Sequence, residues 1–165
     1  MRKTLAGLLC CTAFSVLAMA QAGGGSDQDF LNFAAQTDMT EAHLGKMAQE
    51  QGDSQAVKDL GQMLVTDHTN DYQKLGTLAA KAGLMLPKGI DSKHDKMIAP
   101  FEKLKGKAFD RRYTREMVAG HTAAIAQYQK EAANGQNADL KAYAQETLAT
   151  LEKHKKAAQD AEKAK

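Results

Sequence analysis

Apolar and small residues recur every three or four positions along four long stretches of this chain, which is the spacing of an amphipathic α-helix. The stretches are residues 28–51, 54–82, 107–133 and 138 to near the C-terminus. A short turn at Gly52 and Asp53 separates the first two stretches, and residues 134–137 separate the last two. Pro87 and Pro100 are the only two prolines, and both fall between the second and third stretches. The pattern predicts an all-α fold.

The connection between the second and third stretches is much longer than the other two. It begins at Gly83, which has the position of a helix C-cap, and runs to about Lys105 around a short helical piece. Two short turns and one long middle connection favour a four-helix bundle whose central segment crosses along the bundle. This is the ferritin-like arrangement, in contrast to a plain up-down-up-down bundle.

The first twenty residues have the features of a secretory signal peptide. Two cations precede an apolar run over residues 5–17, and Ala18 and Ala20 supply the small residues of a cleavage site. We therefore expect cleavage after Ala20 and a periplasmic or secreted protein. A flexible leader is predicted at residues 21–27, and one bundle domain at residues 28–163.

Cysteine usage and charge exclude several classes of protein. Cys10 and Cys11 both fall in the predicted signal peptide, so the mature chain would have neither a disulfide nor a thiolate metal site. Neither cysteine follows a small residue, so lipidation is not expected. Without Arg2 and Lys3 the cationic and anionic side chains balance, which gives no basic surface for nucleic acid. No later apolar run approaches the roughly 20 residues of a membrane span.

Each helical stretch places one ionisable residue on its apolar face, where side chains three or four positions apart lie together. These residues, each with an apolar neighbour on the same face, are Glu41 (Leu44), His68 (Leu64), His121 (Met117) and His154 (Leu151). At about 1.5 Å per residue, all four fall within roughly one to two turns of each other along the bundle axis. The sequence therefore predicts one polar layer in the middle of the bundle.

Three imidazoles and one carboxylate form a ligand set that suits zinc, copper or iron, but not calcium or magnesium. Asp67 is expected to orient His68 from outside this set. The alternative is a metal-free polar network in which Glu41 and Asp67 accept hydrogen bonds from the histidines. His43 is expected to face solvent, and His94 lies in the long connection.

The spacing is a poor match to di-iron carboxylate enzymes, which need two Glu-x-x-His pairs and two further glutamates. This chain has instead Glu41-Ala-His43, Asp67-His68 and Glu152-Lys-His154. Three hypotheses stay open. The leading one is transition-metal binding in a storage, sensing or stress role. The others are a metal-free structural or interaction module, and an oxidase or peroxide-handling enzyme at the same layer, with enzymatic activity less favoured.

Short motifs along the chain also occur in the order of a known family. They are Phe33-Ala34-Ala35, Met39-x-Glu41-x-x-Leu44-Gly45, Val57-Lys58, Asp67-His68, Phe109-Asp110 and Leu148-x-x-Leu151-x-x-His154, with Met63, Tyr113, Met117 and His121 between them. Over essentially the whole predicted mature part, the chain resembles the exported bacterial proteins catalogued as domain of unknown function 4142. The resemblance implies export and a ferritin-like bundle, and it points to the five candidate site residues named above. Ala149 departs from the family pattern, which often has proline there, so a straighter last helix is expected.

Overall fold

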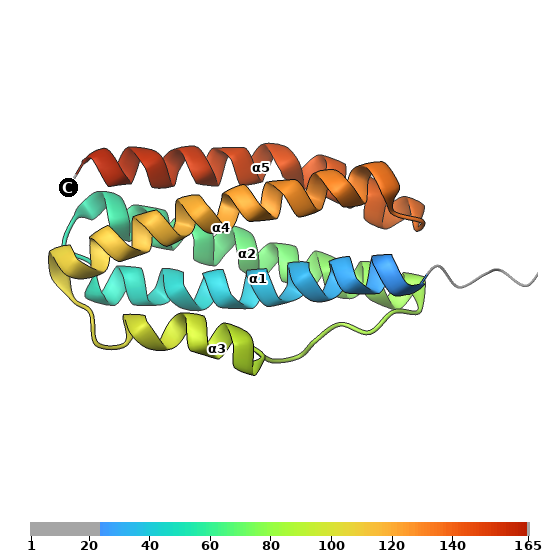
Figure 1. The fold of residues 1–165 in the computed structure, drawn as a ribbon, viewed down its shortest axis with the longest axis horizontal. Helices are drawn as coiled ribbons and strands as arrows, with labels where there is room; N and C mark the ends of the chain where they lie inside the picture. Colours follow the sequence, from blue (N-terminus) through green and yellow to red (C-terminus); the bar gives the residue numbers. More distant parts are fainter. Residues whose placement is uncertain (1–23, 165) are drawn as a thin grey trace, which may run out of the picture.

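The computed structural model describes residues 24–164 as an all-α bundle of four long helices, with a short helix beside it. The elements are α1 (Gly24–Gln51), α2 (Gln55–Ala82), α3 (Ser92–Ile98), the 3-10 turn η1 (Ala99–Phe101), α4 (Gly106–Asn134) and α5 (Ala138–Lys163). α1 packs antiparallel along α2, and α4 packs antiparallel along α5 (Figure 1). The predicted fold class is confirmed, with helix boundaries that agree closely except at the start of α1.

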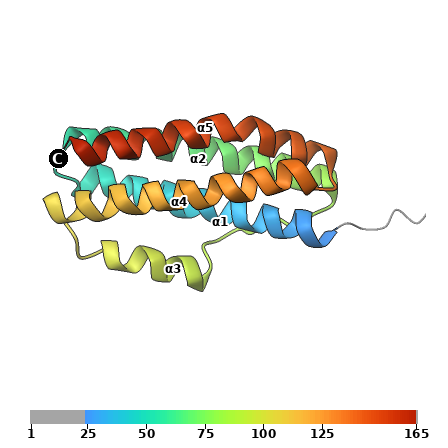
Figure 2. The same cartoon turned by 45° about the horizontal axis from the view of Figure 1, so that its top comes forward.

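The long central connection carries the chain back along the outside of the bundle. It leaves the end of α2, follows the side of α1 and returns to the opposite end, where α4 begins (Figures 1 and 2). α2 and α4 therefore run in the same direction on opposite corners of the bundle, which is the ferritin-like arrangement. The regular structure of the central connection, residues 83–105, consists of α3 and η1, and α3 packs against α1.

The helix ends follow from local sequence signals. The Ser54 side chain caps α2 by accepting a hydrogen bond from the backbone N–H of Val57 (3.3 Å). The Asn137 side chain caps α5 in the same way, accepting from Asp139 and Leu140. Gly83 ends α2 in the left-handed conformation (φ 68°), as the sequence predicted, because glycine adopts a positive φ without steric cost.

Two aspartates join the hairpins to each other in a reciprocal way. Asp110 on α4 accepts hydrogen bonds from the backbone N–H groups of Asp53 and Ser54, both at 2.9 Å, in the turn between α1 and α2. Asp27 on α1 accepts from Gln136 and Asn137, both at 2.8 Å, in the turn between α4 and α5. Each short turn is thus fixed by the first helix of the opposite hairpin, and the two hairpins occupy equivalent places.

α1 begins at Gly24, four residues earlier than the sequence pattern predicted. Tertiary contacts explain the difference: Asp27 is buried at the opposite turn, and the Gln28 amide exchanges two hydrogen bonds with the backbone of Met85. The leader predicted at residues 21–27 is therefore helical from Gly24 onwards. The predicted signal peptide, residues 1–20, lies outside the described residues, and the division into domains stays a prediction.

The bundle core consists of two apolar clusters on either side of a central polar layer. One cluster, towards the start of α1, is built from residues such as Leu31, Leu75, Tyr128, Leu140 and Tyr143. The other, towards the start of α4, is built from residues such as Leu64, Phe101, Phe109, Tyr113 and Met117. Burying each large apolar side chain contributes about 1.5–3 kcal/mol, so the two clusters hold the polar layer in place between them.

Two glycines let α1 and α2 pack very closely. A Cβ atom on Gly61 would lie 2.6 Å from the Gly45 carbonyl oxygen, and one on Gly45 would lie 2.7 Å from the Gly61 carbonyl oxygen. Neither backbone atom can move away without separating the helices. Glycine at both positions is therefore a condition of this helix contact.

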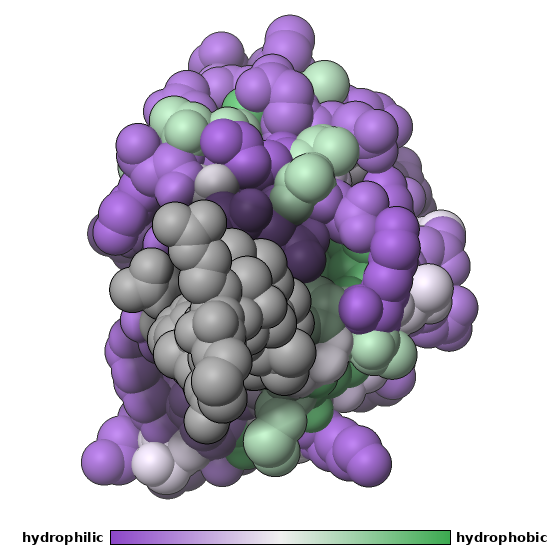
Figure 3. Space-filling model, turned by 90° about the vertical axis from the view of Figure 1, so that its right-hand side faces the viewer, coloured by the Kyte–Doolittle hydropathy of each residue, from purple (hydrophilic) through white to green (hydrophobic). Residues whose placement is uncertain are grey.

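No helix among residues 24–164 is long and apolar enough to cross a membrane. Seen from the end where α1 begins, the part of the surface that grey atoms do not cover is mostly hydrophilic, with hydrophobic residues among the hydrophilic ones (Figure 3).

Candidate metal centre

The four polar residues that the sequence placed on the apolar faces are all buried in one layer. Glu41 is 5% exposed, His68 3%, His121 0% and His154 1%. They come one each from α1, α2, α4 and α5. The predicted inward positions and the shared level are confirmed, while metal binding by these residues stays a prediction.

The three histidine rings lie together, and two of them contact the Glu41 carboxylate. Glu41 Oε2 lies 3.0 Å from His68 Nε2 and 3.3 Å from His121 Nε2. The ring centroids are 5.2–5.8 Å apart, and one nitrogen from each ring lies within 4.8 Å of the others. The packing of four helices thus brings together side chains that are far apart in the sequence.

One nitrogen of each ring, here called the outer nitrogen, forms a hydrogen bond with an oxygen acceptor. His68 Nδ1 donates to Asp38 Oδ1 (2.8 Å), and His154 Nε2 donates to Asp67 Oδ2 (2.8 Å). His121 Nδ1 donates to the backbone carbonyl of Met117 (2.9 Å). In its neutral form, an imidazole that donates from one nitrogen keeps a lone pair on the other, so in that form these bonds select the tautomer that a metal ligand needs. His68, whose pKa is raised to about 10, must lose a proton before it can bind a metal ion.

The second nitrogen of each ring, here called the inner nitrogen, and one oxygen of Glu41 form no hydrogen bond with any described residue. They are Glu41 Oε2, His68 Nε2, His121 Nε2 and His154 Nδ1, and all four are buried. The short contact of Glu41 with His68 is close in distance but does not have hydrogen-bond geometry. A buried polar atom without a partner costs about 1–3 kcal/mol, and the contacts of Glu41 with His68 and His121 offset only part of that cost when the groups are ionised.

Asp67 does not orient His68, contrary to the sequence prediction. Asp67 points to α5 and binds His154, while the carboxylate on His68 comes from Asp38, which the sequence interpretation did not include. A signal for Asp38 was present, because it lies three residues before Glu41 and so shares its helix face. Helix periodicity gives the face of each residue, but not which neighbour across the bundle it meets.

Burial and mutual charge set the protonation of the layer. Burial by itself disfavours charge on His68, but the Glu41 charge and the bond to Asp38 outweigh it and raise the His68 pKa to about 10. Burial also opposes charge on Glu41, yet the positive charges of His121 and His68 hold its pKa below the ordinary value. Burial raises the pKa of Asp38 to about 7 despite its bond to His68.

His154 differs from His68 in its protonation. Burial lowers the pKa of His154 to about 4, and the charges of His68 and His121 act in the same direction against the bond to Asp67. At neutral pH His154 is therefore an uncharged imidazole, which is the form that binds metal ions.

Two openings reach the layer from different sides. A cleft of about 400 Å³ between α2 and α5 is lined by His68 and His154 together with Asp67 and Asp71. A groove of about 700 Å³ between α1, α3 and α4 has Glu41 in its lining. A third, smaller cavity near Glu131 lies at the end of the bundle, away from the histidines.

The two remaining histidines lie outside the layer, as predicted. His43 is exposed on α1. His94 lies on α3, where its Nδ1 atom is 2.8 Å from Asp91 Oδ1.

Comparisons with known proteins place this fold among characterised structures. A solved structure described as CopM in the Cu(II)-bound form has the same fold, with a TM-score of 0.66 and 14% sequence identity. The match covers 84% of this chain and 96% of that one. None of the curated proteins matches this sequence. The family model described as Domain of unknown function (DUF4142) matches residues 14–161, and the chain therefore belongs to that family.

Proposed function

We propose that this protein binds one divalent transition-metal ion in the central layer. His68, His121 and His154 would supply nitrogen ligands, and Glu41 would supply a carboxylate oxygen. The observation that carries the proposal is the contrast within each ring: the outer nitrogen is held by an oxygen acceptor, whereas the inner nitrogen is buried without a hydrogen bond. Metal-binding histidines have this arrangement, because the outer bond sets the orientation of the ring and its tautomer.

The donor set indicates which ions are candidates. Three imidazole nitrogens and one carboxylate suit copper, zinc or iron and do not suit calcium or magnesium, which prefer oxygen ligands. Copper(II) is the first ion to test, since the similarly folded CopM structure is described as Cu(II)-bound. A site with four protein ligands supports storage, sensing or a stress role more than rapid catalysis, which needs an open coordination position.

A metal-free polar network is the second candidate for the same layer. The contact of 3.0 Å between Glu41 and His68 favours it, since an ionised pair there satisfies part of the buried charge. On this hypothesis the layer fixes the register of the helices, which is one known role of buried polar groups. The two candidates differ in whether the protein takes up metal in stoichiometric amount.

Metal analysis of untagged protein distinguishes them. Protein freed of metal with a chelator is titrated separately with Cu(II), Zn(II) and Fe(II), followed by gel filtration and elemental analysis. We expect one equivalent of metal in the unmodified protein and in His43→Ala, which removes an exposed histidine, and loss of that equivalent in His68→Ala and His121→Ala. No bound metal, or full binding in both layer variants, would rule out the site.

We also propose that the protein is exported. The features of residues 1–20 described above support this, and the absence of cysteine after that segment suits an oxidising compartment. N-terminal sequencing of the protein recovered from periplasm or medium should begin at Gln21. Recovery of the uncleaved chain from the cytoplasm alone would contradict export.

A further inference from the structure

The groove between α1, α3 and α4 is large and mostly apolar. Its volume is about 700 Å³, within the range of pockets that hold small organic molecules. Its apolar lining includes Phe33, Leu44, Met97, Phe101 and Met117. The groove exists because the long connection holds α3 along one side of the bundle (Figure 2).

Two buried polar atoms in the lining of this groove have no hydrogen-bond partner among the described residues. They are Thr40 Oγ1 and Arg112 Nε, and Thr40 is only 4% exposed. The guanidinium nitrogen can only donate, so it requires an acceptor. A ligand with acceptor atoms would satisfy both groups, which are otherwise buried at a cost in free energy.

The uncommitted charge along the groove is positive. Lys93 and Lys96 line it, and neither has an ion-pair partner in residues 27–164. The acidic residues of the lining are already engaged. Asp91 caps α3 and contacts His94, Glu41 faces the histidine layer, and Glu116 lies 3.9 Å from Arg112.

We infer that this groove binds a small anionic amphiphile, a single-chain carboxylate of the fatty-acid class. The apolar chain would pack against the Phe33, Met97 and Met117 surface. The carboxylate would accept a hydrogen bond from Arg112 Nε, because the 3.9 Å contact of Arg112 with Glu116 involves Nη2, and Lys96 would add attraction. Guanidinium groups match carboxylates in geometry, and the surrounding apolar wall strengthens their pairing. This site borders the histidine layer at Glu41 but does not require a bound metal.

Binding of decanoate to metal-free protein tests the inference by calorimetry, with the neutral 1-decanol as a comparison. We expect saturable decanoate binding at one site, and binding of 1-decanol weaker by about tenfold or more, since it lacks the charge that Arg112 and Lys96 would attract. Equal affinity for the two ligands, or no saturable decanoate binding, would overturn the inference.

Four variants locate the site. Ala123→Phe places an aromatic ring in the groove, and Met97→Glu places a negative charge on its wall, where Met97 is 50% exposed. Both should weaken decanoate binding by about tenfold or more. Met85→Glu is the matched control, because Met85 is 80% exposed and lies outside the groove. Arg112→Gln should bring decanoate affinity close to that of 1-decanol.

Circular dichroism checks that each variant is folded. All substituted positions lie at least partly at the surface, so retained helicity is expected. An equal loss of binding in Met85→Glu and Met97→Glu, or full binding by Ala123→Phe, would exclude this groove as the site.

Discussion

Asp38 Oδ1 on α1 lies 2.8 Å from His68 Nδ1 on α2, on the side of the ring that faces away from the other histidines. Asp38 is 1% exposed, so this contact is made in the interior of the bundle. It sets the direction in which His68 Nε2 points, towards Glu41. A carboxylate outside the proposed ligand set thus controls the geometry inside it.

Replacing Asp38 should weaken metal binding without removing a ligand. In Asp38→Asn the charge that supports the His68 ring is lost, and partners of this kind contribute about 10–100-fold to metal affinity. Competition titration against a chelator of known affinity measures the change. Asp59→Asn, an exposed residue on the same pair of helices, is the matched control. Unchanged affinity in Asp38→Asn would show that the orientation of His68 does not depend on this bond.

The close contact of α1 and α2 predicts opposite effects for two glycine substitutions on α2. Gly61→Ala places a Cβ atom 2.6 Å from the Gly45 carbonyl oxygen and should destabilise the protein by about 2 kcal/mol or more. In Gly76→Ala the nearest atom is Leu86 Cδ2 at 3.5 Å, so the gain in helix propensity should stabilise the protein by about 0.5–1 kcal/mol. Urea unfolding followed by circular dichroism gives both values. An unchanged free energy of unfolding in Gly61→Ala would contradict the tight packing of α1 and α2.

The reciprocal aspartates predict equal costs at opposite ends of the bundle. Asp27→Ala and Asp110→Ala each remove the acceptor for two backbone N–H groups, and each should lower the free energy of unfolding by about 2 kcal/mol. Because the two sites lie far apart, the double variant should show nearly the sum. Asp29→Ala, an exposed neighbour of Asp27, is the control and should have little effect. A strongly non-additive double variant would contradict independent action.

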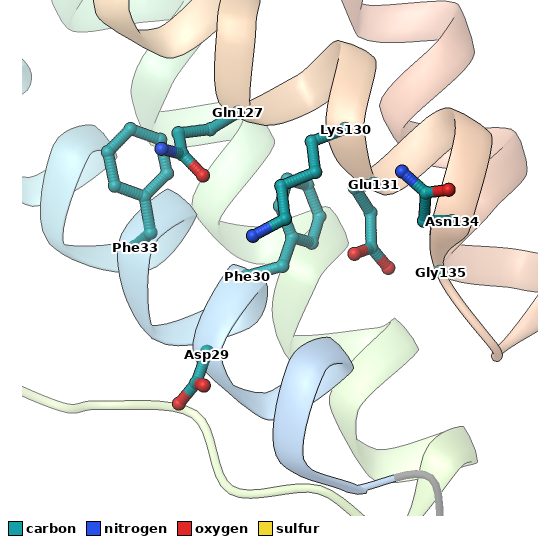
Figure 4. Close-up of a pocket in the computed structure, with 8 residues that line it drawn as sticks. All are labelled: Asp29, Phe30, Phe33, Gln127, Lys130, Glu131, Asn134 and Gly135. Atoms are coloured by element: carbon teal, nitrogen blue, oxygen red, sulfur yellow. The ribbon is translucent and has the colours of Figure 1, made fainter.

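Glu131 makes the free energy of unfolding depend on pH. Its carboxylate points from α4 towards the first turns of α1 (Figure 4), and burial together with the nearby Asp27 charge raises its pKa from 4.5 to about 7. Between these two pH values the folded protein holds a proton that the unfolded chain releases. Stability should therefore fall as pH rises from about 4.5 to about 7, with the full penalty present above pH 7.

Glu131→Gln removes this penalty and provides the measurement. The variant should be more stable than the unmodified protein at pH 8 by about 1 kcal/mol, since solvent in the adjoining cavity screens the charge, and the difference should disappear at pH 4. Unfolding in urea at both pH values measures this difference in the free energy of unfolding. Glu152→Gln, on the exposed side of α5, is the control. A variant that is less stable at pH 8 would show that the carboxylate is stabilising there.

Helix positions and the inward faces of Glu41, His68, His121 and His154 could be predicted from the sequence. Both depend on local rules: the 3.6-residue period fixes which side chains share a face, and capping residues such as Gly83 mark where helices end. The length of the central connection also indicated the ferritin-like order of helices, because a long segment can cross the bundle and a short turn cannot.

Contacts between helices could not be predicted in this way. The bonding of Asp67 to His154, of Asp38 to His68 and of Asp27 to the distant turn depends on how each helix is rotated and shifted against its neighbours. That rotation is set by the packing of whole surfaces, including the close approach at Gly45 and Gly61, and no single helix contains the information. The sequence by itself determined which residues face inward, and the tertiary structure decided which of their atoms are satisfied and which are left facing one another.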